Sequence, residues 1–96
     1  MKRQYELTVL FAPDLAPDVL KKTQDTIASF INQHGSVEKI DQWGKKQLAY
    51  TINKKTEALY VYYEFSLEPS QVKALEDLVL HTEGVIRHLI VNALEN

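Results

Sequence analysis

The order in which apolar periodicity changes along the chain constrains its fold more than any other feature. Apolar and polar residues alternate from Tyr5 to Phe11, which predicts a strand buried on one face. Pro13 and Pro17 break this pattern, and apolar residues then recur at helical spacing as far as Gly35. We expect Gly35 to end this helix in the left-handed conformation. The chain thus opens with a strand and a helix of about five turns.

Two strands follow this helix. The segment 36–52 has strand-type patterning, and Gly44 within it indicates a bulge or a bend. A polar turn at Asn53–Glu57 separates this strand from Leu59–Phe65, which carries the strongest strand signal in the sequence. The two neighbouring strands therefore form a predicted hairpin.

The last part of the chain predicts a second helix and a fourth strand. Pro69–Gln71 opens a helical period that we expect Gly84 to close, and Val85–Ala93 is rich in β-branched and aliphatic residues. The resulting βαββαβ order is typical of the α+β, ferredoxin-like sandwich, in which two helices cover one face of a four-stranded antiparallel sheet. With 96 residues we expect a single domain, 1–96.

The sheet face without helices is where function is expected. On the strongest strand, one parity is apolar and predicts core positions: Leu59, Val61, Tyr63, Phe65 and Leu67. Tyr60, Tyr62 and Glu64 then point outward. Outward aromatic residues fit two interpretations, contact with another molecule or ordinary packing of a partly covered sheet.

The composition excludes several kinds of site. The chain has no cysteine, which excludes disulfides, thiolate metal sites and cysteine nucleophiles and favours an intracellular protein. The histidines at 34, 81 and 88 lack metal-ligand spacing, so we expect no metal and helix-end or surface roles. The facing of His88 depends on whether the last strand carries a bulge. No apolar run approaches the ~20 residues that cross a bilayer, so we expect a cytoplasmic protein with no membrane partner.

No group of residues in the sequence is typical of catalysis. Acidic pairs such as Glu76-Asp77 lack an accompanying histidine, serine or glycine-rich anion cradle. The segment Ala12-Pro13-Asp14 after the first strand has neither the glycine nor the arginine of a phosphate-cradling loop. We therefore expect no enzyme, no cofactor and no small-molecule substrate. An acylphosphatase-like enzyme and a ligand-sensing or oligomerising domain, both compatible with this fold, remain as alternatives.

Basic residues occur as three pairs: Lys2 and Arg3, Lys45 and Lys46, Lys54 and Lys55. Each pair alone is interpreted as a solvated charge run at a strand end. Three such pairs near tyrosines favour nucleic acid, because cations contact phosphates and aromatic rings stack on bases. The net charge of −2 is weak evidence against this, since local patches matter more than the total. The glycine-interspersed aromatic signature of the RNA-recognition fold is absent, which favours protein contact for the tyrosines.

The segment Gly44–Lys54 reads Gly-Lys-Lys-Gln-Leu-Ala-Tyr-Thr-Ile-Asn-Lys, a quite specific run. On this run the chain resembles the bacterial-type ribosomal protein six family of the small subunit. The similarity extends over nearly the whole chain, through Tyr5-Glu6, Gly35, Trp43-Gly44, Tyr60 to Phe65 and Val85-Ile86-Arg87. Two departures stand out: Thr51 where the family often has proline, and Gln47 where many members have a basic residue. We expect this chain to lack one phosphate contact at Gln47.

The resemblance implies a structural component of the small ribosomal subunit in the cytoplasm. It implies two partners, the central domain of small-subunit ribosomal RNA and small-subunit ribosomal protein eighteen, and no cofactor. At matching positions, the RNA-facing residues are Lys2, Arg3, Lys46 and Arg87, to which the basic pairs add Lys45, Lys54 and Lys55. The residues expected on the partner-protein face are Tyr50, Tyr60, Tyr62, Leu89 and Val91.

Overall fold

The computed structural model describes residues 1–52 and 54–93, so Asn53 of the predicted polar turn lies outside the described residues. The elements follow the predicted βαββαβ order, with a short 3-10 turn at Pro69–Gln71 before the second helix. They are β1 (Arg3–Phe11), α1 (Pro17–His34), β2 (Gly35–Ile52), β3 (Lys55–Leu67), α2 (Val72–Leu80) and β4 (Val85–Asn92).

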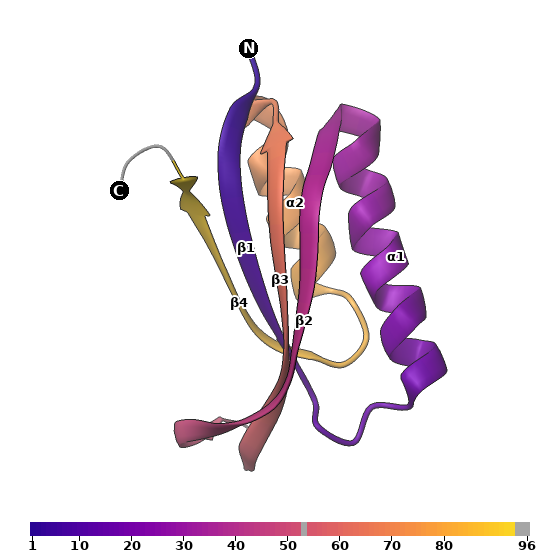
Figure 1. Ribbon diagram of the computed structural model, residues 1–96, viewed down its shortest axis with the longest axis vertical. Coiled ribbons are helices and arrows are strands. Elements are labelled where there is room, and N and C mark those ends of the chain that lie inside the picture. Colours follow the sequence, from indigo (N-terminus) through magenta and orange to yellow (C-terminus); the bar gives the residue numbers. More distant parts are fainter. Residues whose placement is uncertain (53, 94–96) are drawn as a thin grey trace.

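The four strands form an antiparallel sheet in the order β2-β3-β1-β4. Both helices pack on one face of this sheet, and β4 and β2 are its edges (Figure 1). The predicted α+β, ferredoxin-like sandwich is therefore confirmed. No helix within residues 1–52 and 54–93 is long and apolar enough to cross a membrane.

The core lies between the sheet and the helices. Every second residue of β1 and β3 faces it, and these side chains alternate with partly exposed neighbours along each strand. The five apolar positions predicted on β3 all face this core, although Leu59 is only partly buried. The helices contribute Ile27 and Ile31 from α1 and Leu75 and Val79 from α2, all fully buried. Burial of each such side chain stabilises the folded state by roughly 1.5–3 kcal/mol, because apolar area is removed from water.

The two helix ends depart from the prediction at their glycines. Gly35 is the first residue of β2 and has an extended φ of −174°, so the expected left-handed helix end is wrong there. Glycine is needed because a Cβ at this position would overlap the carbonyl oxygen of Ser66 on β3. Gly84 has a left-handed φ of +85° but lies in the loop before β4, because α2 already ends at Leu80.

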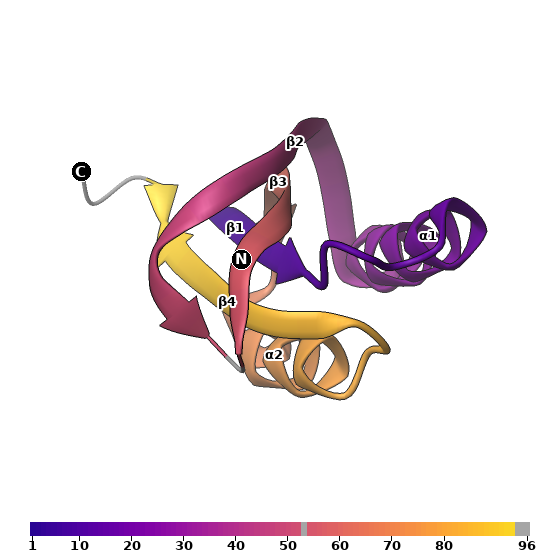
Figure 2. The ribbon, with the colours of Figure 1, turned by 90° about the horizontal axis from the view of Figure 1, so that it is seen from below.

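The β2–β3 hairpin covers part of the face that the helices leave open. The pairing register shifts between Gln42 and Gly44, so Trp43 is an extra residue in β2, and Gly44 has a φ of +80°. This confirms the predicted bulge. Beyond it, β2 arches away from the helices toward β4 (Figure 2). Leu10, on the helix-free side of β1, is buried in consequence. The sequence predicted a wholly open face, and the structure shows one end of it covered by this hairpin.

Candidate functional site

An aromatic cluster lies on the helix-free face, where the bulge in β2 directs Trp43 over β3. The Trp43 ring stacks on Tyr62, with centroids 5.0 Å apart and planes 13° apart, and on Tyr60 at 6.4 Å and 24°. The Nζ of Lys46 lies 5.2 Å from the Trp43 centroid and 5.9 Å from that of Tyr60, within cation–π range. Trp43 itself stays 43% exposed. The cluster therefore presents an amphipathic surface to the outside.

Trp43 was not among the residues that the sequence predicted for either interface. Tyr60 and Tyr62 point away from the core as predicted, but they are half-buried because the Trp43 ring partly covers them. The available signal was the Trp43-Gly44 step itself, since a bulge next to glycine re-aims the adjacent side chain. The orientation of that side chain depends on which strand residue is the extra one, and the pattern alone does not give this.

Two carboxylates and a tyrosine continue the face toward the other end of the sheet. Glu6 on β1 lies directly opposite Glu64 on β3, and the Tyr62 hydroxyl donates to Oε2 of Glu64 at 3.0 Å. Partial burial and these two carboxylates raise the pKa of Tyr62, so its hydroxyl stays a donor. Lys39 lies opposite Glu64 on β2, but its Nζ pairs with Asp41 at 3.4 Å. Among residues 1–52 and 54–93 neither Glu6 nor Glu64 has an ion-pair partner.

A hollow of about 360 Å³ lies between the curled hairpin and the strands β1 and β4. An Nη1–H of Arg87 donates to the Tyr50 hydroxyl at 2.6 Å across this hollow, which ties the hairpin to β4. Tyr50 and Leu89 stand at its rim, with 62% and 61% of their surface exposed. The lining residues are Thr8, Leu10, Leu48, Ala49, Tyr50, Tyr60, Arg87, His88 and Leu89.

The structure brings together most residues predicted for the partner-protein face. Tyr50, Tyr60 and Leu89 line the hollow, and Tyr62 joins them through Trp43. Val91 lies further along β4, opposite Glu6. All five therefore belong to the helix-free side of one sheet. We call this side, together with Trp43, Glu6 and Glu64, the open face.

The residues predicted for RNA contact fall into two groups at opposite ends of the sheet. Arg3 pairs with Leu67, the last residue of β3, whereas Lys55 is the first residue of that strand. Lys2 and Arg3 therefore lie at the end marked N in Figure 1, far from the hairpin at its lower end. The hairpin-end cations are Lys45, Lys46, Lys54, Lys55 and Arg87, of which Lys55 also pairs with Asp14 at 3.8 Å. The three predicted basic pairs therefore form two separate groups, one at each end of the sheet.

The three histidines are dispersed, as their spacing predicted. His34 packs against Phe30 at the end of α1, and Nδ1 of His81 lies 2.7 Å from the carbonyl oxygen of Asp77 at the end of α2. A register shift between β1 and β4 turns His88 to the helix side, where its Nε2 lies 3.7 Å from Glu76. No group of three metal-ligating side chains occurs in the part of the chain that the structure describes.

The loop after β1 does not form an anion cradle. The backbone N–H of Ala12 donates to the carbonyl oxygen of Gly84 at 2.8 Å, and that of Leu15 to Ala12 at 3.2 Å. The first residue of α1 is Pro17, which has no N–H to offer. These amides are therefore occupied or absent, which gives an acylphosphatase-type phosphate site no support.

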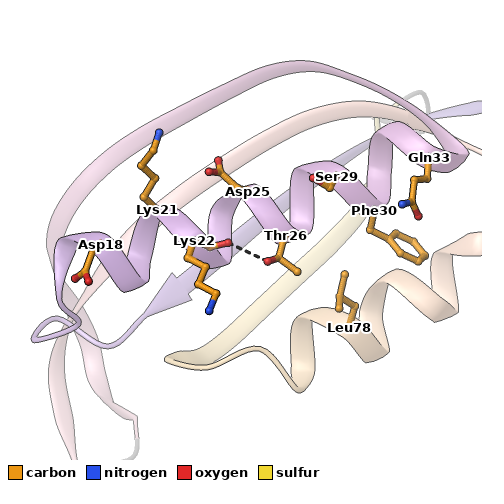
Figure 3. A pocket seen from close by; sticks show the side chains of 9 residues that line it. All are labelled: Asp18, Lys21, Lys22, Asp25, Thr26, Ser29, Phe30, Gln33 and Leu78. Carbon is orange, nitrogen blue, oxygen red and sulfur yellow. Dashed lines mark hydrogen bonds between the residues drawn. The ribbon is translucent and has the colours of Figure 1, made fainter.

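A second, wider hollow of about 630 Å³ lies on the opposite layer, between α1 and α2. Phe30 and Leu78 face each other across it, while charged residues of α1 stand around its margin (Figure 3). Those charges have both signs, with Asp18 and Asp25 beside Lys21 and Lys22. The groove therefore has no net charge preference and no convergent set of polar groups.

Comparison with known proteins bears on the whole chain. A family model described as ribosomal protein S6 matches residues 4–92. The small ribosomal subunit protein bS6 of Clostridium beijerinckii is 36% identical over 91 residues, which cover 94% of this chain and 96% of that protein. The protein of the same name from Moorella thermoacetica is 35% identical over 94 residues, covering 97% and 96%.

A solved structure agrees with the observed fold. The crystal structure of 30S ribosomal protein S6 from Thermotoga maritima matches with a TM-score of 0.91 and covers 99% of this chain and 91% of that one. At 22% identity this likeness speaks for the shared fold. The family model, in turn, runs from the second residue of β1 to the end of β4. The chain therefore belongs to the ribosomal protein S6 family and is a structural component of the small subunit of the cytoplasmic ribosome, not an enzyme.

Proposed function

We propose that the protein binds the central domain of small-subunit ribosomal RNA together with small-subunit ribosomal protein eighteen. The open face meets the partner protein, and the hairpin-end cations approach the RNA. The observation that carries this proposal is a sheet with one face sealed by helices and the other exposing apolar and aromatic side chains. Trp43, Tyr50 and Leu89 are 43%, 62% and 61% exposed on that second face.

The chemistry of the open face favours a protein partner. Aromatic and aliphatic side chains around a hollow are typical of the centres of protein interfaces, where a few anchors carry most of the binding energy. Tyr60 and Tyr62 are engaged with Trp43, and Tyr62 donates its hydroxyl to Glu64. Two carboxylates on this face, Glu6 and Glu64, repel a phosphate backbone. RNA is therefore disfavoured over the middle of the sheet.

The hairpin end has the opposite chemistry. Lys45, Lys46, Lys54 and Arg87 are exposed there, and no carboxylate pairs with any of these four within the described ranges 1–52 and 54–93. Four or five cations on a chain of net charge −2 give a modest affinity for RNA and a small dependence on salt. Tight binding then depends on the partner protein, which adds contacts to the same RNA and raises the effective concentration.

A salt titration by filter binding tests this cooperativity. The protein is titrated into a central-domain fragment of small-subunit ribosomal RNA, with and without ribosomal protein eighteen. We expect weak binding alone and an affinity at least about tenfold higher with the partner. Tight binding that is independent of the partner contradicts the proposal.

A matched pair of double variants tests the assignment of the cations. Lys54→Gln with Lys55→Gln removes two charges from the hairpin end, and Lys21→Gln with Lys22→Gln removes two from α1 on the opposite layer. The hairpin variant is expected to reduce the slope of log K against log salt by about one to two, because each lost phosphate contact removes roughly 0.7–0.9. The α1 variant is expected to leave the slope unchanged. If both double variants reduce the salt slope equally, the hairpin is not the RNA contact.

A further inference from the structure

We infer that the open face recognises an extended segment of its partner protein that carries an apolar anchor side chain and, two or four residues away, a lysine or arginine. The anchor fills the hollow under the hairpin, and the cation lies between Glu6 and Glu64. This inference rests on the proposed function, because it specifies which features of the partner protein the open face selects.

The hollow fits an apolar anchor. Its aliphatic lining comes from Leu10 on β1, Leu48 and Ala49 on β2, and Leu89 on β4. Two of its polar lining groups, Arg87 and Tyr50, are hydrogen-bonded to each other. A volume of about 360 Å³ is large enough for one large side chain, and desolvated pockets of this kind are typical places for interface anchors.

The carboxylate pair fits a cation from outside the chain. Glu6 and Glu64 are directly opposite in the sheet, an arrangement that destabilises it by repulsion. Lys39, the nearest lysine by register, is held by Asp41 at 3.4 Å. Tyr62 donates one hydrogen bond to Glu64 and keeps this carboxylate in place without neutralising it. A guanidinium or ammonium group placed between the two carboxylates offsets the repulsion.

The distance between the two features sets the spacing in the partner. Along β1, Leu10, Thr8 and Glu6 point to the same side, with Leu10 and Thr8 at the hollow. A strand rises about 3.3 Å per residue, so Glu6 lies about 7 Å from Thr8 and about 13 Å from Leu10. An extended segment along β4 covers these distances with two or four residues, and side chains two or four residues apart point the same way.

The charge pattern selects a protein segment rather than RNA for this surface. Val91 lies opposite Glu6 and continues the apolar strip that begins at Leu89. By strand register, Lys45 and Lys46 lie beyond Gly44 and Tyr60, away from the two carboxylates, although the Nζ of Lys46 reaches back over the Trp43 ring. A phosphate backbone that follows β4 past Arg87 toward Val91 would meet Glu6 and Glu64, which have no ion-pair partner within residues 1–52 and 54–93. A basic protein segment is attracted to this part of the open face.

Two variants with matched controls test the inference by calorimetric titration of ribosomal protein eighteen. Leu89→Ala removes an apolar wall of the hollow, and Leu80→Ala, equally exposed at 61%, removes the same group from α2. Glu6→Gln removes one carboxylate from the open face, and Asp77→Asn removes one from the exposed side of α2. All four variants are measured as the full chain.

We expect Leu89→Ala to weaken binding about tenfold and Leu80→Ala to leave it unchanged. Glu6→Gln should weaken binding about fivefold at low salt, with the difference vanishing near 0.5 M salt, roughly where exposed charges are screened. The same variant should raise the Tm of the free protein by about 2–4 °C, because it relieves the cross-strand repulsion. Weaker binding by a more stable protein distinguishes recognition from mere damage to the fold.

Several results overturn the inference. If Glu6→Gln binds ribosomal protein eighteen as tightly as wild type, the inference is wrong and the proposed function stands. The same holds if Leu89→Ala and Leu80→Ala lose equal affinity for that protein. Absence of any binding by the wild-type protein contradicts the proposed function and the inference with it. If Leu89→Ala instead weakens binding of the ribosomal RNA fragment in the absence of the partner protein, the hollow holds a nucleotide and the inference is wrong.

Discussion

Two adjacent residues of β3 show how different the two faces of this sheet are. Tyr63 points toward the helices, is fully buried, and its hydroxyl has no hydrogen-bond partner within the described residues. Tyr62 points the other way, stacks on Trp43 and donates its hydroxyl to Glu64. The helix-covered face fills space with side chains of the right volume, even where a polar atom is left unsatisfied. On the open face the Tyr62 hydroxyl is hydrogen-bonded, while apolar surface stays exposed.

This contrast separates stability from recognition. Side chains on the helix-covered face are in contact with α1 and α2 and contribute mainly to the free energy of unfolding. The exposed side chains of the open face, Trp43, Tyr50 and Leu89, contribute little to stability until a partner covers them. Substitutions on the two faces should therefore act on different measurements.

The largest expected difference is between Leu7→Ala and Leu89→Ala. Leu7 is fully buried on the helix side of β1, so truncation should lower the free energy of unfolding by about 2–5 kcal/mol. Leu89 is 61% exposed on the other side, so its truncation should change the free energy of unfolding by less than about 0.5 kcal/mol. Urea unfolding followed by circular dichroism measures both. Comparable losses would show that the open face belongs to the core of the isolated chain.

Gly35→Ala should have the next largest effect. The added methyl group overlaps the carbonyl oxygen of Ser66, so β2 has to move away from the end of β3. We expect a loss of about 1–3 kcal/mol, typical of an overpacked site. Thermal unfolding compares it with Gly44→Ala, where a new Cβ meets no atom within 4 Å but the φ of +80° remains unfavourable. A Gly35→Ala variant as stable as wild type would refute the close approach.

Tyr63→Phe should stabilise the protein slightly. It removes a buried hydroxyl without a described partner, and we expect a gain of about 1 kcal/mol. Burial, with a smaller contribution from Asp25, raises the pKa of Tyr63 in the folded state. The unfolded chain therefore ionises first, near pH 10, and the stability that depends on a neutral Tyr63 is lost as the pH rises further.

Unfolding at alkaline pH tests whether stability falls in this way as the pH rises. Urea midpoints measured from pH 8 to pH 11 should fall less steeply for Tyr63→Phe than for wild type. Tyr62→Phe is the matched control on the open face, and it should be slightly less stable than wild type at pH 8 because Glu64 loses its donor. A fall in the stability of Tyr63→Phe at pH 8 would contradict the assignment of an unsatisfied hydroxyl.

The sequence predicted the elements and the facing of the central strand because these depend on local periodicity. Alternation along β1 and β3 identifies the core side, and the βαββαβ order then leaves few topologies. The two glycines at the helix ends were assigned wrongly in part, since a glycine that allows close approach looks the same in a sequence as one with positive φ. Gly35 and Ser66 meet only after β2 pairs with β3.

The site was predictable as a set of residue types but not as an arrangement. Nothing local in the segment 45–52 indicates that the hairpin curls over the sheet, because the curl depends on the bulge at Trp43 and on the long-range bond from Arg87 to Tyr50. The division of the cations between two ends of the sheet was also not predictable, because it follows from strand register. The role of Trp43 was missed because it depends on which residue of β2 is the extra one in the bulge.

The account depends most on the open face being the surface that the partner protein covers, and Trp43 reports on it directly. Trp43 is the chain's one tryptophan, so labelling with 5-fluorotryptophan gives a single fluorine resonance. On addition of unlabelled ribosomal protein eighteen we expect this resonance to shift and its H2O/D2O isotope shift to fall, as the exposed part of the ring is covered. An unchanged resonance and isotope shift, in a sample where light scattering shows the complex, would contradict the account.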